Sequence, residues 1–206
     1  YTLAKSTDTN QNSATFSQNN SPLNAFNRSL DAGPSNFDVR HKVVVSAIYA
    51  PKLYNGDRSS FYNYVLNGWS IAPIYAYYSG RPFDGTISGT TVNGTNGDSR
   101  FPLNTRNIYR LPALSNLDLR LSKRFKFSEH YNLEFLVEGF NVFNRTQVFG
   151  ENSTLYNRTT NCFTINGITT SNPNSLCYNP NFGQVTTTDS TLYRERQIQF
   201  SARFQF

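Results

Sequence analysis

The chain has 206 residues, enough for one domain of ordinary size, and a formal net charge of +6 at pH 7. Hydrophobic residues make up only 37% of it, yet aromatic residues reach 15%, a mixture typical of strands with one apolar face joined by long polar loops. Lysine and arginine are spread along the chain without a dense cluster, which argues against a nucleic-acid partner.

The N-terminal half predicts at least three strands. Residues 1–6 are typical of the end of a strand, and the chain has no methionine, so we expect a piece of a longer protein. Residues 43–50 predict a second strand. Residues 59–80 carry no charge, and about 20 apolar residues would span a bilayer as a helix, but Pro73 and the alternation of Trp69 with Ile71 favour a strand.

The next two predicted strands form a hairpin around a short turn at residues 128–130. Residues 116–127 alternate apolar and polar side chains, with only Lys123 out of phase, and residues from 132 onward alternate in the same way. Two registers are open: one pairs Arg124 with Glu134, and the other pairs Lys126 with Glu134. The first predicts charge pairs on the polar face, which would line a lumen, between these residues: Arg120, Arg124, Glu134 and Glu138.

Residues 196–206 alternate most strictly of all. Ile198, Phe200, Ala202, Phe204 and Phe206 lie in one phase, and polar side chains occupy the other. Three phenylalanines on one face of a terminal strand would promote aggregation if water surrounded them, so that face must be covered.

The connections between these strands alternate in length. Short turns are expected at about residues 51–63 and 128–130, and long polar segments at about residues 7–36, 79–115 and 146–190. Three such loops are unusual in a compact soluble domain but typical of an outer-membrane barrel, in which lipid covers the apolar face. The sequence therefore predicts an all-β fold: about the last six strands of an antiparallel transmembrane β-barrel, with short periplasmic turns and long extracellular loops.

Six stretches also resemble the TonB-dependent outer-membrane receptors, specifically the C-terminal barrel portion of the Oar-like group. They occur in the family's order: "FDVRHKVVVSAIY", "NGWSIAPIYAYYSGRPF", "NLDLRLSKRF", "EFLVEGFNVFNRTQ", "NFGQV" and "RQIQFSARFQF". The resemblance implies that residues 1–206 are part of a Gram-negative outer-membrane receptor that takes up an unidentified ligand. It also implies that a plug domain and the segment that contacts the TonB energising complex lie outside this chain.

In outer-membrane barrels generally, a terminal strand of this kind resembles the signal that the barrel-assembly machinery reads by strand pairing. Phe200, Phe204 and Phe206 would be the recognised side chains, and they would also face the outer-membrane lipid. Packing against lipid alone is the alternative.

The remaining candidates are few. Cys162 and Cys177 predict a disulfide in the longest loop, worth about 3 kcal/mol for a loop of about 15 residues, with two unrelated thiols as the alternative. His41 and His130 are the only histidines, and no catalytic motif accompanies them, so we expect neither an enzyme nor a cofactor or metal. A second hypothesis is a secreted β-sandwich whose aromatic side chains, such as Trp69 and Tyr75, bind carbohydrate.

Overall fold

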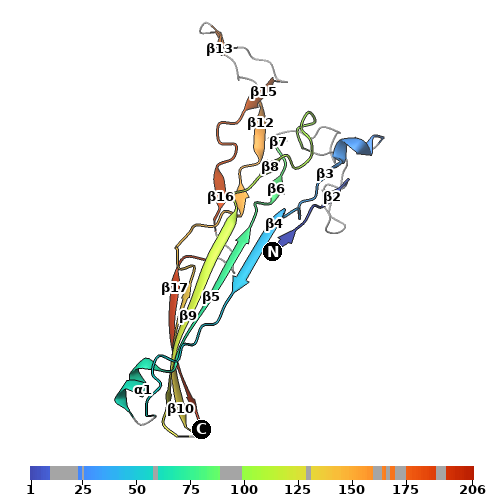
Figure 1. The fold of residues 1–206 in the computed structure, drawn as a ribbon. Coiled ribbons are helices and arrows are strands. Elements are labelled where there is room, and N and C mark those ends of the chain that lie inside the picture. Colours follow the sequence, from blue (N-terminus) through green and yellow to red (C-terminus); the bar gives the residue numbers. More distant parts are fainter. Residues whose placement is uncertain are drawn as a thin grey trace.

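A computed structural model describes residues 1–9, 23–24, 26–57, 60–88, 99–128, 131–159, 164–165, 168–169, 175–188 and 194–206. Its main element is an open sheet of six strands in the order β1, β4, β5, β9, β10, β17 (Figure 1). The bounds are Thr2–Leu3 for β1, His41–Ser46 for β4, Trp69–Tyr78 for β5, Leu114–Lys126 for β9, Asn132–Phe140 for β10 and Gln197–Gln205 for β17.

Neighbouring strands of this sheet are antiparallel and, for the described strands, nearly follow chain order, so the sheet is an up-and-down meander. This confirms the predicted all-β class, the antiparallel arrangement and the number of strands. Within the described residues, no helix combines the length and the apolar character needed to cross a membrane.

The registers bring the apolar phases of all long strands onto one face. Val45 lies opposite Tyr75, and Leu121 lies between Ile71 and Val137. Val137 in turn lies opposite Phe200 of the last strand. Because side chains alternate with period two, this register also gathers the polar phases on the other face.

The connection between β4 and β5 differs from the expected turn at residues 51–63. It contains a short helix, α1 (Phe61–Leu66), so the first half of the uncharged segment at residues 59–80 is helical and only its second half is a strand. Gly68, with φ 82°, makes the change from helix to strand, a backbone conformation that favours glycine. In Figure 1, α1 and the C terminus lie at the same end of the sheet.

The other end of the sheet carries the long connections, which contain short paired strands where polar loops were expected. Their short strands form four pairs and one triplet: β2 with β3, β6 with β8, β11 with β16, β13 with β14, and β12 between β15 and β7. The bounds are Thr7–Asp8 (β2), Gly33–Pro34 (β3), Pro82–Phe83 (β6), Thr86–Ser88 (β7), Tyr109–Arg110 (β8), Gly150–Glu151 (β11), Thr154–Thr159 (β12), Thr164–Ile165 (β13), Ile168–Thr169 (β14), Ser175–Tyr178 (β15), Val185–Thr187 (β16) and Arg28–Asp31 for a 3₁₀ turn, η1.

Candidate functional site

The polar face of the sheet carries two ion pairs that join β9 to β10. Arg120 Nη2 lies 2.6 Å from Glu138 Oε1, and Arg124 Nη2 lies 3.3 Å from Glu134 Oε1. In each pair the two residues are register partners on β9 and β10, which confirms the first of the two predicted registers. Since both arginines are exposed, each pair contributes at most about 1 kcal/mol and serves mainly to fix the register.

The last strand extends this polar row in a way that the sequence reasoning missed. Arg203 of β17 lies opposite Glu134, so the carboxylate stands between Arg124 on one side and Arg203 on the other. Gln199 lies opposite Glu138 in the same manner. The alternation of residues 196–206 contained this signal, because it placed Gln199 and Arg203 in the polar phase.

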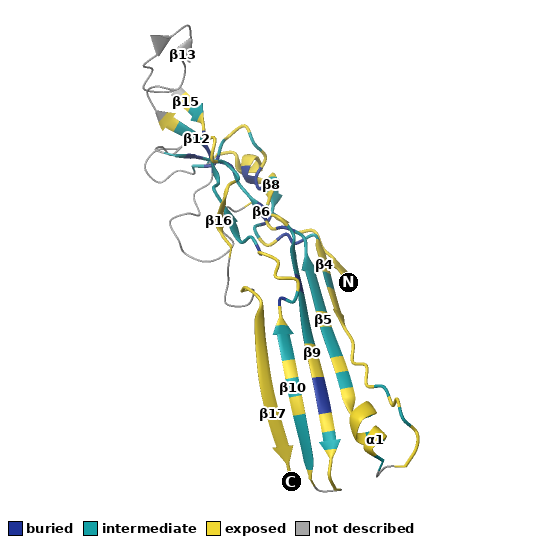
Figure 2. Ribbon diagram, turned by 90° about the vertical axis from the view of Figure 1, so that its left-hand side faces the viewer, coloured by how far each residue is buried: buried dark blue, intermediate teal, exposed yellow. Residues whose placement is uncertain are grey.

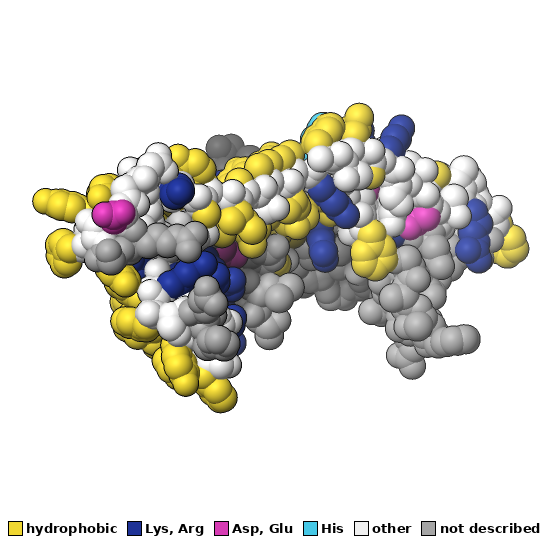
Figure 3. Space-filling view, turned by 60° about the horizontal axis from the view of Figure 1, so that its bottom comes forward, with side chains coloured by type: hydrophobic (Ala, Val, Ile, Leu, Met, Phe, Trp, Pro, Cys, Tyr) yellow, Lys and Arg dark blue, Asp and Glu magenta, His cyan; other side chains and the backbone are white. Residues whose placement is uncertain are grey.

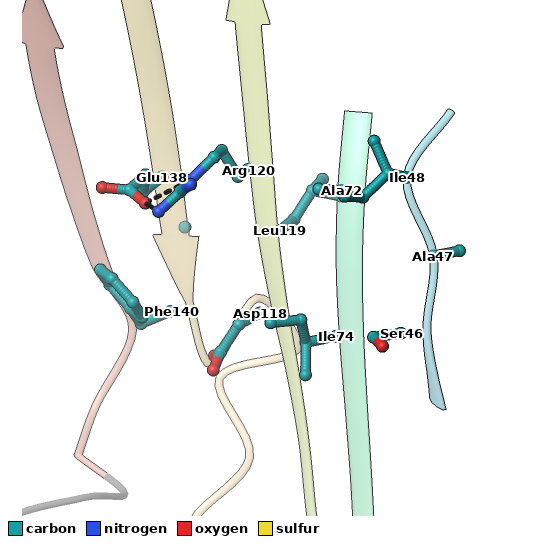
Figure 4. Close-up of a pocket in the computed structure, with 11 residues that line it drawn as sticks. Ser46, Ala47, Ile48, Ala72, Ile74, Asp118, Leu119, Arg120, Glu138 and Phe140 are labelled. Atoms are coloured by element: carbon teal, nitrogen blue, oxygen red, sulfur yellow. Dashed lines mark hydrogen bonds and ion pairs between the residues drawn. The ribbon is translucent and has the colours of Figure 1, made fainter. Parts of the chain in front are cut away.

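A hollow of about 640 Å³ opens on the same face, next to the Arg120–Glu138 pair (Figure 4). Asp118, Arg120 and Glu138 supply its charged groups, and the rest of its wall is mostly apolar: Ser46, Ala47, Ile48, Ala72, Ile74, Leu119, Gly139 and Phe140. A mostly apolar wall with a few placed charged groups is typical of a site that binds a small molecule, in which the charges orient the ligand.

Asp118 is held in place at the end of the hollow nearest the long connections. Its Oδ1 accepts hydrogen bonds from Asn116 Nδ2 at 2.8 Å and from the backbone N–H of Asn141 at 3.0 Å. Asn141 has a φ of 48° and donates through Nδ2 to the carbonyl oxygens of Arg145 and Arg194. One buried asparagine therefore ties the ends of β9, β10 and β17 together.

Three ion pairs, of which Arg100–Asp31 is buried on both sides, fasten the N-terminal connection to the segment at residues 99–110. Arg100 Nη2 lies 2.7 Å from Asp31 Oδ1, Arg106 pairs with Asp8, and Arg110 pairs with Asp38. Burial lowers the pKa of Arg106. We call these six side chains the loop cluster. Figure 2 shows buried positions in this part of the molecule, whereas most of the main sheet is half-buried or exposed.

Aromatic side chains join the same connections to the segment after β10. The rings of Tyr109 and Phe182 lie 4.8 Å apart between centroids, and those of Phe101 and Tyr156 lie 4.9 Å apart. Phe83 lies within 6.1 Å of Phe182. Together with the loop cluster, these contacts hold the described parts of three long connections against one another at one end of the sheet.

The predicted assembly residues lie on an open edge. Phe200, Phe204 and Phe206 are 76%, 56% and 93% exposed, and β17 pairs with β10 on one side only among the described strands. Their exposure agrees with a face or an edge that meets something outside this chain. Their recognition by an assembly machinery stays a prediction.

Two other predicted features have different outcomes. His41 is exposed at the start of β4, and its Nδ1 lies 2.9 Å from the Tyr1 hydroxyl, a pairing of two surface side chains. Cys177 lies in β15, but Cys162 lies outside the described residues, as does His130, so the disulfide stays a prediction.

Lys123, the one charged side chain in the apolar phase of β9, reaches the backbone at the end of α1. It is 7% exposed, and its Nζ donates to the carbonyl oxygens of Val65 and Asn67 at the end of α1. The sequence could not reveal this contact, because the helix that supplies the carbonyls was not predicted.

Comparison with known proteins identifies the family. The family model described as "Outer membrane beta barrel domain" matches residues 1–105 and 99–199. No curated protein matches the chain. No solved structure matches it. The single main sheet, whose apolar face no second sheet covers among the described strands, does not fit the alternative of a secreted β-sandwich. The chain therefore belongs to the outer-membrane β-barrel domain family, and its place is the outer membrane.

Proposed function

We propose that this chain is the C-terminal sector of the barrel of a TonB-dependent receptor of the Oar-like group, which takes up a ligand across the outer membrane. The observation that carries the proposal is the position of the six resembling stretches. They form β4, β5, β9, β10 with the Asn141 turn, the Phe182 contact and β17. The resembling stretches thus coincide with strands of the main sheet and with the contacts that Asn141 and Phe182 make beyond the strand ends.

The geometry of the polar face supports a large barrel. Small barrels fill their interior with side chains, whereas large ones leave a channel or hold a plug. Here the polar face presents Arg120, Glu138 and Asp118 around a hollow, and the sheet ends in two edges, β1 and β17. Further strands would close such a sheet, and a plug or a ligand would meet its charged face.

The roles of the partners follow from this proposal. Phe200, Phe204 and Phe206 would serve the barrel-assembly machinery, lipid would cover the apolar face, and the TonB energising complex would act through an N-terminal part outside residues 1–206. The chain itself would then have no enzymatic activity, and the ligand is unidentified.

The experiment measures binding of the purified periplasmic domain of a TonB protein to the full-length protein in detergent, by surface plasmon resonance. We expect saturable binding, and we expect it to disappear when the segment on the N-terminal side of the plug is deleted. A full-length protein that folds in the outer membrane and shows no binding would contradict the receptor and leave a barrel with another role.

A further inference from the structure

The helix α1 exposes its apolar side chains, whereas its one amide side chain, Asn63, contacts the C-cap residue Asn67. Asn67 Oδ1 accepts from the backbone N–H groups of Leu53 and Tyr54 at 2.8 and 2.9 Å, and its Nδ2 donates to Asn63 Oδ1 at 2.7 Å. Phe61 and Tyr62, by contrast, are 75% and 63% exposed. A helix on the surface of a soluble protein has the opposite arrangement, so the exposed face of α1 requires an apolar partner.

Two side chains of the apolar sheet face hold the end of α1. Lys123 Nζ donates to the Val65 carbonyl at 2.9 Å, and Trp69 Nε1 donates to the same carbonyl at 2.9 Å. Lys123 and Trp69 lie opposite each other in the phase that also contains Leu121. The helix therefore lies against the lipid-facing side of the sheet and not over the polar hollow.

This contact also explains a charged residue in the apolar phase. A lysine that faces the hydrocarbon of a bilayer destabilises the fold, most strongly at the midplane and less near the interface. The carbonyls at the C-terminal end of α1 accept from this ammonium group, and the helix dipole favours a cation there. The Lys123 ammonium also lies 4.8 Å from the centre of the Trp69 ring.

We propose that α1 lies in the headgroup region of the phospholipid leaflet at the short-connection end of the barrel, with Phe61, Tyr62 and Val65 inserted toward the acyl chains. The proposal rests on the outer-membrane family and not on ligand uptake. The exposed face of α1 is continuous with the lipid-facing side of the sheet, as its contacts with Lys123 and Trp69 require, and Figure 3 shows hydrophobic side chains gathered at this end of the molecule.

The chemistry of α1 favours lipid over another protein. Tyrosine and tryptophan prefer the boundary between headgroups and acyl chains, and the helix contains no charged residue that would need a protein partner. A six-residue helix is also too short to be stable by its own hydrogen bonds. Insertion into the interface, together with the Lys123 and Trp69 contacts, supplies the missing stabilisation.

The test places a nitroxide spin label on the full-length protein reconstituted in phospholipid vesicles. Tyr62→Cys reports on α1, Asn55→Cys is an aqueous reference from the same connection, and Val45→Cys is a lipid reference from the apolar sheet face. Protein without an introduced cysteine is treated in parallel, so that any signal from Cys162 or Cys177 can be subtracted. Collision rates with oxygen and with a water-soluble nickel chelate are then measured.

We expect the label at position 62 to collide with oxygen, as at position 45, and to lose the collisions with nickel that position 55 retains. Nickel collisions equal to those at position 55 would place α1 in water and overturn the proposal. A label that neither reagent reaches would be covered by protein and would overturn it as well. Lipid contact at position 62 in a protein that does not bind TonB would leave this inference intact while the proposed uptake fails.

Discussion

At the scale of single residues, Asp38 of the loop cluster connects the chain around Ser6 to Arg110. Its carboxylate accepts from the backbone N–H of Ser6 at 2.9 Å and pairs with Arg110, while Arg40 lies 3.6 Å away. Burial alone would raise the pKa of Asp38, but the Ser6 hydrogen bond and the arginines outweigh it, so the pKa lies below its ordinary value of 3.8. The ionised form is thus the one that the folded cluster stabilises.

This shift predicts a pH dependence for the N-terminal connection. A carboxylate with a lowered pKa contributes stability above the pKa of its unfolded form, and this contribution is lost as the pH falls through the lowered folded value. We therefore expect the peptide around Ser6 to exchange its amide hydrogens faster as the pH drops below about 4. Deuterium uptake of the full-length protein, corrected for intrinsic exchange rates, measures this.

The matched control is Asp38→Asn, which keeps the side-chain shape and removes the charge. At neutral pH the variant should exchange faster than the wild-type protein, and the difference between them should vanish in acid. A difference that stays constant from neutral to acid pH would show that Asp38 does not act through its ionisation. All other acidic groups are common to both proteins, so their contribution cancels in the difference.

At the scale of elements, strict alternation was enough to predict the long strands but not the parts between them. β9, β10 and β17 follow from side chains that repeat every second residue. Opposite charges in the polar phase left two registers open, and the structure has the one that pairs Arg124 with Glu134. The helix α1 gave no such signal, because its six residues span fewer than two turns and Ser60 makes no side-chain cap.

The terminal strand makes an element-level prediction about assembly. Deletion of Phe206 should lower the amount of full-length protein in the outer membrane, because the terminal aromatic residue would no longer be available for recognition. Phe206 is 93% exposed and has little packing to lose, so a purely structural role predicts a small effect. Cell fractionation followed by immunoblotting measures the amount, and Gln205→Ala, on the polar face, is the control.

Equal amounts of the deletion variant and the wild-type protein would count against an assembly role. In that case the three phenylalanines would be lipid-facing side chains of the edge strand and nothing more. A loss in Gln205→Ala as large as in the deletion would instead indicate that any change to this strand disturbs folding.

At the scale of the whole molecule, the loop cluster shows why sequence reasoning stopped at the sheet. Arg100 and Asp31 are 69 residues apart in the chain, and Arg110 and Asp38 are 72 apart. No periodicity links such residues, since their contact depends on how the connections fold back over the end of the sheet. The hollow beside Asp118 was missed for another reason: its wall combines residues in or next to β4, β5, β9 and β10, and the sequence does not determine the registers of all these strands.

The two faces of the sheet allow one prediction that concerns the molecule as a whole. Val44 and Val45 are neighbours in β4, and 55% and 56% of their surfaces are exposed. Val45 lies opposite Tyr75 on the apolar face, whereas Val44 lies opposite Ala76 on the polar face. The two positions therefore differ in their surroundings and hardly at all in their exposure within this chain.

Val45→Arg should reduce the folded full-length protein in outer-membrane fractions, because an arginine on the lipid side costs about 2–4 kcal/mol near the bilayer midplane. Val44→Arg should leave that amount nearly unchanged, because its side chain meets water and polar groups in the lumen. The heat-dependent shift of folded barrels on gels measures both variants side by side. Equal losses would mean that protein packs on both faces of β4. A greater loss for Val44→Arg would mean that the face with Val44 meets lipid and the face with Val45 lines the lumen. Each of these results would contradict the assignment of lipid to the face that carries Val45, Leu121 and Phe200.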